Sequence, residues 1–395
     1  SKPVRMTDPI TTAGKVDWKT IRSQFLIPPE LTVLNAANLC PSPAPILETV
    51  YNYTQRLDSK PVPSYRAEMI EVKEKTRQDL AKYLRVSPEE ILITRNTSES
   101  NNWVSNGLDL RAGDEVVIFS DNHPSNNEAW KERGKRFGFT VNEVPPVNPH
   151  PGFDYYLETF KKALTPRTRV LSFTHLSNTV GDLFPAKELC RMARNRGIIT
   201  LIDGAQSLGL LDVDLSDIQP DFYSGSAHKW PCGPKETGVL FVNKSIQERF
   251  WPSIYSAYKG REGLAQTHEG LGQRDTPAIH AFGQQIKFLR KIGQENIEER
   301  SGNFATEIIE ELQKIKDIYI FTSDERALRS AVVTFRPANL EPAKVVKALE
   351  EDGIVAANLG GEDWAGVRFS PHFYNSNNDV ERAVGAIRRY SLKGL

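Results

Sequence analysis

Residues 224–234 read SGSAHKWPCGP and lead into the apolar stretch Gly238–Val242. Lys229 lies within this segment, among small, hydroxyl and imidazole side chains and between apolar stretches. A buried ammonium is costly, whereas a lysine that is neutral or held in a Schiff base is not. The segment therefore predicts a reactive lysine rather than a structural one.

The chain around Lys229 alternates short apolar runs with helical patterns. Runs of four or five residues rich in Val, Ile, Leu and Phe are typical of buried parallel strands. This alternation predicts a doubly wound α/β domain over residues 30–264. The expected strands are Ile91–Thr94, Glu115–Phe119, Val170–Thr174, Ile198–Ile202 and Gly238–Val242, and the expected helices include Arg66–Leu84, Ser125–Phe137 and Ala186–Arg196.

The pattern changes after about residue 265, where longer helical stretches begin. It predicts a smaller α+β domain over residues 265–395, joined by residues 1–29. The expected helices are Ala278–Leu289, Ile297–Lys314, Pro342–Asp352 and Val380–Tyr390, and the expected strands are Ser330–Arg336 and Val367–Ser370.

Composition excludes several classes of function. The 395 residues carry 50 basic and 50 acidic side chains, which argues against nucleic acid or an anionic membrane as the main partner. No apolar run approaches the length of a membrane span, so we expect a soluble protein. Three cysteines are too few for a disulfide framework or a four-ligand zinc site, and no metal is expected. We expect a cytoplasmic location; because the chain starts at Ser1, prior removal of an export signal is the alternative.

Polar side chains follow the predicted strands in chain order. Ligands of open α/β sheets bind outside the carboxyl ends of the strands, so these residues outline a site. Thr97 and Ser98 come after the first strand, at a helix start that suits a phosphate. The later strands are followed by His123, Asn178, Asp203 and Gln206.

Each of these clusters also has a simpler structural interpretation. Thr97 and Ser98 can be an ordinary N-cap, His123 a loop histidine, and Asp203 a turn-capping residue before Gly204. Together with Lys229, however, they supply a phosphate cradle, a ring-stacking imidazole, an acid for a ring nitrogen and a lysine that forms a Schiff base. The set favours one site over separate structural roles.

The segments Asp203-Gly204-Ala205-Gln206 and Ser226-Ala227-His228-Lys229 resemble class V, fold-type I pyridoxal-phosphate (PLP) enzymes, the group of cysteine desulfurases and isopenicillin-N epimerases. Asp203 and Lys229 are separated by 26 positions, and the polar clusters occur in the family's order. The resemblance extends from Leu34 to Asn375. It implies a large mixed-sheet domain, a smaller C-terminal α+β domain, and pyridoxal 5'-phosphate as the cofactor.

The resemblance also implies a role for each position. Lys229 is expected to form the Schiff base and then move protons at the substrate Cα. Asp203 is expected to keep the pyridine nitrogen protonated, and His123 to stack on the ring. The other implied contacts are Thr97, Ser98, Ser226 and His228 to the phosphate, Asn178 and Gln206 to the ring oxygen, and Asn38 and Arg368 to the substrate.

Two departures from the family pattern narrow the activity. Desulfurases carry a persulfide-forming cysteine in a loop before the strand with the substrate arginine, but residues 354–368 read IVAANLGGEDWAGVR. No cysteine follows Cys232, so a persulfide-forming desulfurase is not expected. Gln273 stands where many relatives place a threonine that reaches the phosphate of the partner subunit. We expect Gln273 and Arg274 to border the active site of the partner subunit in a homodimer. The alternative is that these two residues form an ordinary surface turn.

The reaction is less determined than the cofactor. The segments LNAAN (34–38), NHPSNNEAW (122–130), HKWPCGP (228–234) and VRFSPHFYN (367–375) are most similar to the isopenicillin-N-epimerase-like branch. An epimerase needs a second acid/base besides Lys229. The unranked candidates are Tyr65, Tyr255, Tyr258 and His372. A C–S β-lyase acting on cysteine derivatives, an aminotransferase and a non-catalytic PLP-binding protein are the alternatives.

Overall fold

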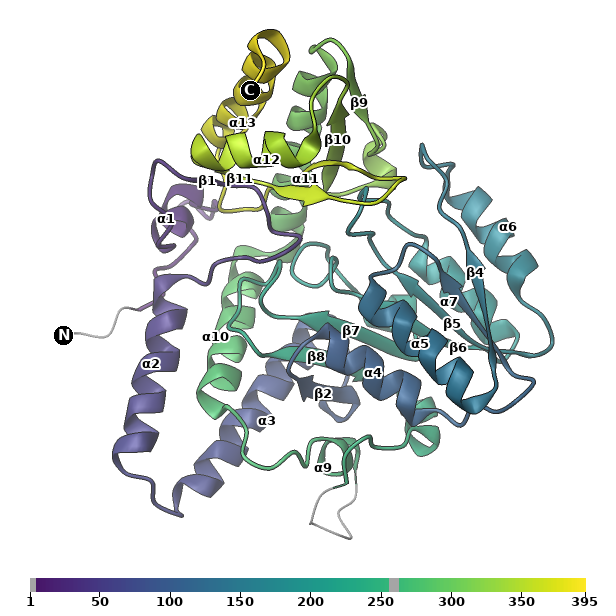
Figure 1. Cartoon of the computed structure of the whole chain (residues 1–395). Coiled ribbons are helices and arrows are strands. Elements are labelled where there is room, and N and C mark those ends of the chain that lie inside the picture. The colour runs from purple at the N-terminus through teal and green to yellow at the C-terminus, as the bar shows by residue number, and fades with distance from the viewer. Residues whose placement is uncertain (1–4, 256–262) are drawn as a thin grey trace.

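A computed structural model describes residues 5–255 and 263–395 (Figure 1). Its centre is a sheet of seven strands in the order β2-β8-β7-β6-β5-β3-β4, in which only β8 runs antiparallel to its neighbours. The strands are β2 (Ile91–Thr94), β3 (Glu115–Phe119), β4 (Thr140–Val144), β5 (Thr168–Thr174), β6 (Ile199–Asp203), β7 (Phe222–Ser226) and β8 (Gly238–Val242). Parallel strands joined through helices place the carboxyl ends of β3, β5 and β6 at one edge of the sheet.

Helices cover both faces of this sheet. On one face, α4 (Thr97–Gly107) and α5 (Pro124–Phe137) bury Trp103 and Trp130 against Leu92, Val116 and Leu201. A second apolar core lies on the other face and includes Leu80, Ile93 and Phe282. The helices of that side are α2 (Ala44–Ser59), α3 (Tyr65–Leu84), α6 (Phe153–Ala163), α7 (Ala186–Asn195), α8 (Leu215–Ile218) and α10 (Thr276–Ile292), and the short α1 (Trp18–Ser23) and α9 (Leu264–His268) complete this part.

The C-terminal part is built on an antiparallel sheet of four strands in the order β12-β13-β10-β9. These are β9 (Ile318–Ile320), β10 (Val333–Pro337), β12 (Ala357–Leu359) and β13 (Gly366–Phe369). The helices α11 (Gln294–Gln313), α12 (Pro342–Glu351) and α13 (Asn377–Lys393) pack on it around a separate apolar core (Figure 1). A parallel pair joins β1 (Thr32–Val33) to β11 (Ile354–Val355), so the chain enters this part before it builds the large sheet.

The predicted mixed α/β fold class is confirmed, and the predicted strands match β2, β3, β5, β6 and β8 to within two residues. The patterns missed β7 and the edge strand β4, because neither has a continuous apolar run. The division into two domains at residue 265 stays a prediction. Helix α10 lies after this position, yet its Ile279, Phe282 and Ile286 belong to the core of the large sheet. Within the described residues, no helix is both long and apolar enough to cross a membrane.

Candidate active site

Lys229 follows β7 in a tight turn. Its carbonyl accepts from the Cys232 N–H at 3.0 Å, and the Gly233 N–H donates to the Ala227 carbonyl at 2.7 Å. The side chain is half-buried, and its ammonium makes no hydrogen bond or ion pair with a described residue. Burial lowers the pKa of Lys229 to about 8; the charge of Asp203 opposes this shift and that of Arg368 adds to it. An amine with such a pKa is partly neutral near pH 7 and can act as a nucleophile.

Asp203 is the last residue of β6 and is only 2% exposed. Its Oδ2 accepts from Asn101 Nδ2 at 3.1 Å, and its Oδ1 accepts from the Ala205 N–H at 3.0 Å. Gly204 leaves no room for a side chain, since an added Cβ would lie 2.2 Å from Tyr223 Cζ. The carboxylate is therefore held in one orientation by neutral donors and is available to a cationic group.

Asn101 was not predicted from the sequence, although it lies four positions after Thr97 on the same face of α4. Its side-chain amide both donates and accepts a hydrogen bond: Nδ2 donates to Asp203, and Oδ1 accepts from Ser224 Oγ at 2.7 Å. Asn101 is 1% exposed. It links β7, α4 and β6 and fixes the Asp203 carboxylate.

The first turn of α4 contacts β7 through two of the residues predicted to hold a phosphate, Thr97 and Ser226. The Thr97 N–H donates to Ser226 Oγ at 2.8 Å, and the two hydroxyls lie 2.6 Å apart. The Ser98 side chain is exposed, and the His228 ring makes no hydrogen bond with a described residue. Burial, with Lys229 and Lys235 nearby, lowers the pKa of His228 to about 4. Two hydroxyls, an imidazole and a helix N-terminus fit a phosphate group, and Glu99, the carboxylate in this first turn, is paired with Arg95.

His123 caps the N-terminus of α5 at the end of β3. Its Nδ1 accepts from the Ser125 N–H at 3.2 Å and lies 2.8 Å from Ser125 Oγ. Burial and the charge of Lys229 lower the pKa of His123. Asn122 ties this loop to β5, because its Oδ1 accepts from the Thr174 N–H at 2.8 Å. The imidazole is therefore neutral and held by one edge, which suits stacking on a ring.

Arg368, on β13, is 5% exposed, and burial lowers its pKa to about 10. Its Nη1 donates to the Asn178 carbonyl at 2.7 Å, its Nη2 donates to Asn35 Oδ1 at 3.4 Å, and its Nε is buried without a partner. The unused donor fits an anionic ligand. The structure places Asn35 beside this guanidinium, whereas the predicted Asn38 has an exposed side chain.

Gln206 has partners within the protein. Its Nε2 donates to the Ala37 carbonyl at 3.0 Å, and its Oε1 accepts from Trp230 Nε1 at 2.7 Å. It thereby joins the segment around residue 37 to the turn that carries Lys229. Of the predicted ring-oxygen contacts, Asn178 gives its carbonyl to Arg368 and has a partly exposed side chain.

The predicted second acid/base is not identified by these contacts. His372 is fully buried, with Nε2 2.6 Å from the Trp230 carbonyl and Nδ1 3.1 Å from Ser301 Oγ, and burial lowers its pKa to about 3. Tyr255 is 75% exposed, and Tyr258 lies outside the described residues. Cys232 packs with Cys40 and His372 beneath the lysine turn, and burial raises its pKa well above the usual value.

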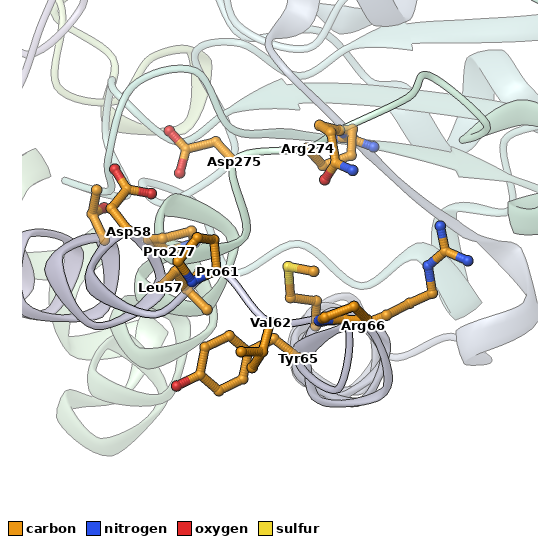
Figure 2. Close-up of a pocket in the computed structure, with 13 residues that line it drawn as sticks. Leu57, Asp58, Pro61, Val62, Tyr65, Arg66, Arg274, Asp275 and Pro277 are labelled. Atoms are coloured by element: carbon orange, nitrogen blue, oxygen red, sulfur yellow. The ribbon is translucent and has the colours of Figure 1, made fainter.

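Gln273 and Arg274 line a surface pocket of about 800 Å³ between α2, α3 and the start of α10. Figure 2 shows Arg274 and Asp275 on one side of the pocket and Tyr65 and Arg66 on the other. Arg274 Nη2 donates to the Ile93 carbonyl at 3.0 Å, while its Nη1 is buried without a partner. The Gln273 side chain is exposed.

The buried carboxyl group of Asp182 lowers the stability of the folded protein when it is ionised. Asp182 is 2% exposed with Oδ1 unpartnered, and burial, together with the charge of Asp121, raises its pKa to about 7. An unfolded aspartate has a pKa near 4, so the folded protein loses stability as the pH rises from about 4 through 7.

We therefore expect Asp182→Asn to raise the free energy of unfolding at pH 8 by roughly 1–4 kcal/mol and to change it little at pH 4.5. Urea denaturation at both pH values measures the effect. Asp217→Asn, at an exposed carboxylate paired with Lys187, is the control and should show no such pH dependence. Equal pH dependence in wild type and Asp182→Asn would contradict the assignment.

A lysine after β7, a buried carboxylate at the tip of β6, a neutral imidazole after β3 and a phosphate-compatible helix start define the site of a fold-type I PLP enzyme. Comparison with known families agrees. The aminotransferase class-V model matches residues 33–383. The chain therefore belongs to the aminotransferase class-V family, and it is a PLP-dependent enzyme, as the sequence resemblance predicted.

Individual relatives differ in activity. Isopenicillin N epimerase of Amycolatopsis lactamdurans is 28% identical over 393 residues, which cover 95% of this chain and 98% of that protein. Cysteine desulfurase of Haloferax volcanii is 31% identical over 322 residues, which cover 76% and 74%. The solved structure of the cystine C–S lyase C-DES with its product cysteine persulfide has a TM-score of 0.84 at 21% identity, over 91% of this chain and 97% of that one.

Proposed function

We propose that this enzyme moves a proton at the Cα of an amino-acid substrate, as an epimerase similar to isopenicillin N epimerase. The observation that carries the proposal is Lys229, a half-buried amine whose pKa burial lowers to about 8 and which makes no hydrogen bond or ion pair with a described residue. When bound, the cofactor supplies a ring that takes up the electrons released at Cα. Lys229 moves the proton on one face of that carbon, and epimerisation needs a second acid/base to move it on the opposite face.

The other residues hold the reacting groups in place. Thr97, Ser226 and His228 would bind the phosphate, and the Asp203 carboxylate would hold a proton on the ring nitrogen. Arg368 would bind the substrate carboxylate through its unpartnered Nε. The similarity to isopenicillin N epimerase over nearly the full length of both chains supports epimerisation as the outcome.

A C–S β-lyase is the second candidate. It needs only Lys229 and a leaving group, and the similarity in fold to the cystine C–S lyase C-DES favours keeping it. A desulfurase that uses a protein persulfide is not proposed, although desulfurases are among the relatives, because no cysteine occurs after Cys232. We further propose a homodimer, in which Gln273 and Arg274 border the partner's site.

Incubating the holoenzyme with a panel of L-amino acids in deuterated water separates these reactions. We expect deuterium at Cα together with loss of chirality. Pyruvate with sulfide from cysteine, or pyruvate with cysteine persulfide from cystine, would instead identify the lyase. Accumulation of pyridoxamine phosphate would contradict both the epimerase and the lyase and would indicate an aminotransferase. Formation of alanine and sulfide from cysteine would show that the enzyme is a desulfurase after all. Absence of any Cα exchange across the panel would leave a non-catalytic binding protein and overturn the proposal.

A further inference from the structure

The loop between β12 and β13, residues 360–365, is tied to the large sheet at a point beside the site. Trp364 is half-buried, and its indole Nε1 donates to Asp121 Oδ1 at 3.2 Å. Asp121 lies just beyond β3, two residues before His123. This is the loop whose sequence lacks the cysteine that desulfurases carry.

Asp121 also binds the large-sheet side of this junction. Its Oδ2 accepts from the Thr179 hydroxyl. The segment 178–180 gives three consecutive carbonyls to side chains of the small sheet and its connections: Asn178 accepts from Arg368 Nη1 at 2.7 Å, Thr179 from Thr334 Oγ1 at 2.5 Å, and Val180 from Thr322 Oγ1 at 2.7 Å. The Asp121 carboxylate therefore accepts one hydrogen bond from the C-terminal part, from Trp364, and one from the large domain, from Thr179. Arg368 donates to the residue next to Thr179, so it belongs to the same set of polar contacts between the two parts.

The far end of the loop is also anchored. Arg336 Nε donates to the Ala365 carbonyl at 2.5 Å, and the Trp364 ring meets Phe321 edge-on with centroids 5.7 Å apart. Arg368 follows Trp364 by four positions and pairs with Thr334 across β13 and β10. A displacement of the loop would therefore be passed to the strand that carries the arginine.

We propose that Asp121 and Trp364 form a positioning pair that locks loop 360–365 to the carboxyl edge of β3 and so orients Arg368 for a substrate carboxylate. The assignment of Arg368 rests on the proposed function, whereas the lock itself does not. In this enzyme loop 360–365 holds the strand that carries Arg368. In a desulfurase, by contrast, the corresponding loop carries the nucleophilic cysteine. Burial, opposed by the hydrogen bonds from Thr179 and Trp364, raises the pKa of Asp121 to about 6, and Asp363 adds to the rise.

Trp364→Phe removes the indole N–H and keeps the aromatic ring, while Asp121→Asn removes one of the two acceptor oxygens. Hydrogen–deuterium exchange of the peptide covering residues 357–368 measures the lock without any substrate. We expect at least about tenfold faster exchange at residues 360–365 in each variant. The double variant should be no faster than the quicker single variant, because Trp364→Phe removes the bond between the indole and residue 121 and Asp121→Asn weakens the same bond by removing the charge of its acceptor.

The chain supplies a matched control. Trp251 Nε1 donates to Asp109 Oδ2 at 3.2 Å, so Trp251→Phe removes an indole–carboxylate bond of the same length. It should leave exchange at residues 360–365 unchanged. Unchanged exchange in both Asp121→Asn and Trp364→Phe would overturn the lock.

Kinetics then tests the consequence for Arg368, with the most active amino acid from the panel as the probe. We expect KM to rise about 10- to 100-fold in both variants while kcat changes less than threefold. In wild type KM should rise as the pH falls through about 6, and Asp121→Asn should remove this step. A loss of kcat with unchanged KM would overturn the positioning role. Faster exchange in a protein that turns over no amino acid would contradict the proposed function alone.

Discussion

Lys229→Ala should lower turnover by at least about 10³-fold, because the variant loses both the covalent attachment of the cofactor and the group that moves the proton at Cα. The wild-type protein supplied with pyridoxal 5'-phosphate should keep a visible absorption band after dialysis. The variant should lose that band, although Thr97, Ser226 and His228 remain to bind the phosphate. Spectra and initial rates with the best substrate of the panel measure both effects.

Lys235→Ala provides the comparison, since this exposed lysine lies only six positions further along and influences the pKa of His228. It should retain the absorption band and stay within a few-fold of wild-type activity. Equal losses in the two variants would mean that positive charge near the phosphate site, rather than the amine of residue 229, supports activity.

Asp203→Asn should lower kcat by about 10²- to 10³-fold while the cofactor remains bound, because a neutral amide no longer stabilises a proton on the ring nitrogen. Asn101→Ala should give a smaller loss, about tenfold, because the carboxylate keeps its charge and its bond from the Ala205 N–H. Rates, together with the absorption spectrum as a function of pH, distinguish the two effects.

Asp221→Asn is the structural control for this pair. Asp221 Oδ2 accepts from the Thr200 N–H at 2.9 Å, at the opposite end of β6 from Asp203. The substitution should alter stability and leave kcat near its wild-type value. A wild-type rate in Asp203→Asn would contradict the role assigned to the carboxylate.

The large sheet was predictable wherever a strand is apolar on both faces. β2, β3 and β8 read as continuous apolar runs because helices cover both sides. β7 reads FYSGS and was missed, although all five residues are buried. Its serines are polar because they bind site residues: Ser224 donates to Asn101, and Ser226 contacts Thr97. The strand departs from the apolar pattern where it serves the site.

The site was predictable to the extent that its residues follow strands. The structure brings Asp203, Lys229 and Arg368 close enough to His123 for their charges to influence its pKa. Asp203 and Arg368 likewise influence the pKa of Lys229. Asn101 and Asn35 were missed because their partners are distant in sequence, and no local pattern marks such contacts. The lock between Asp121 and Trp364 spans 243 positions and depends on the packing of the small sheet against the large one.

Reduction of the holoenzyme with borohydride, followed by digestion and mass spectrometry, tests the central assignment most directly. Reduction makes the bond between cofactor and lysine permanent, so the modified peptide identifies the lysine itself. We predict a pyridoxyl phosphate group on Lys229 and on no other lysine of the chain. A modified peptide elsewhere, or a fully loaded protein that carries no covalent label, would contradict the account.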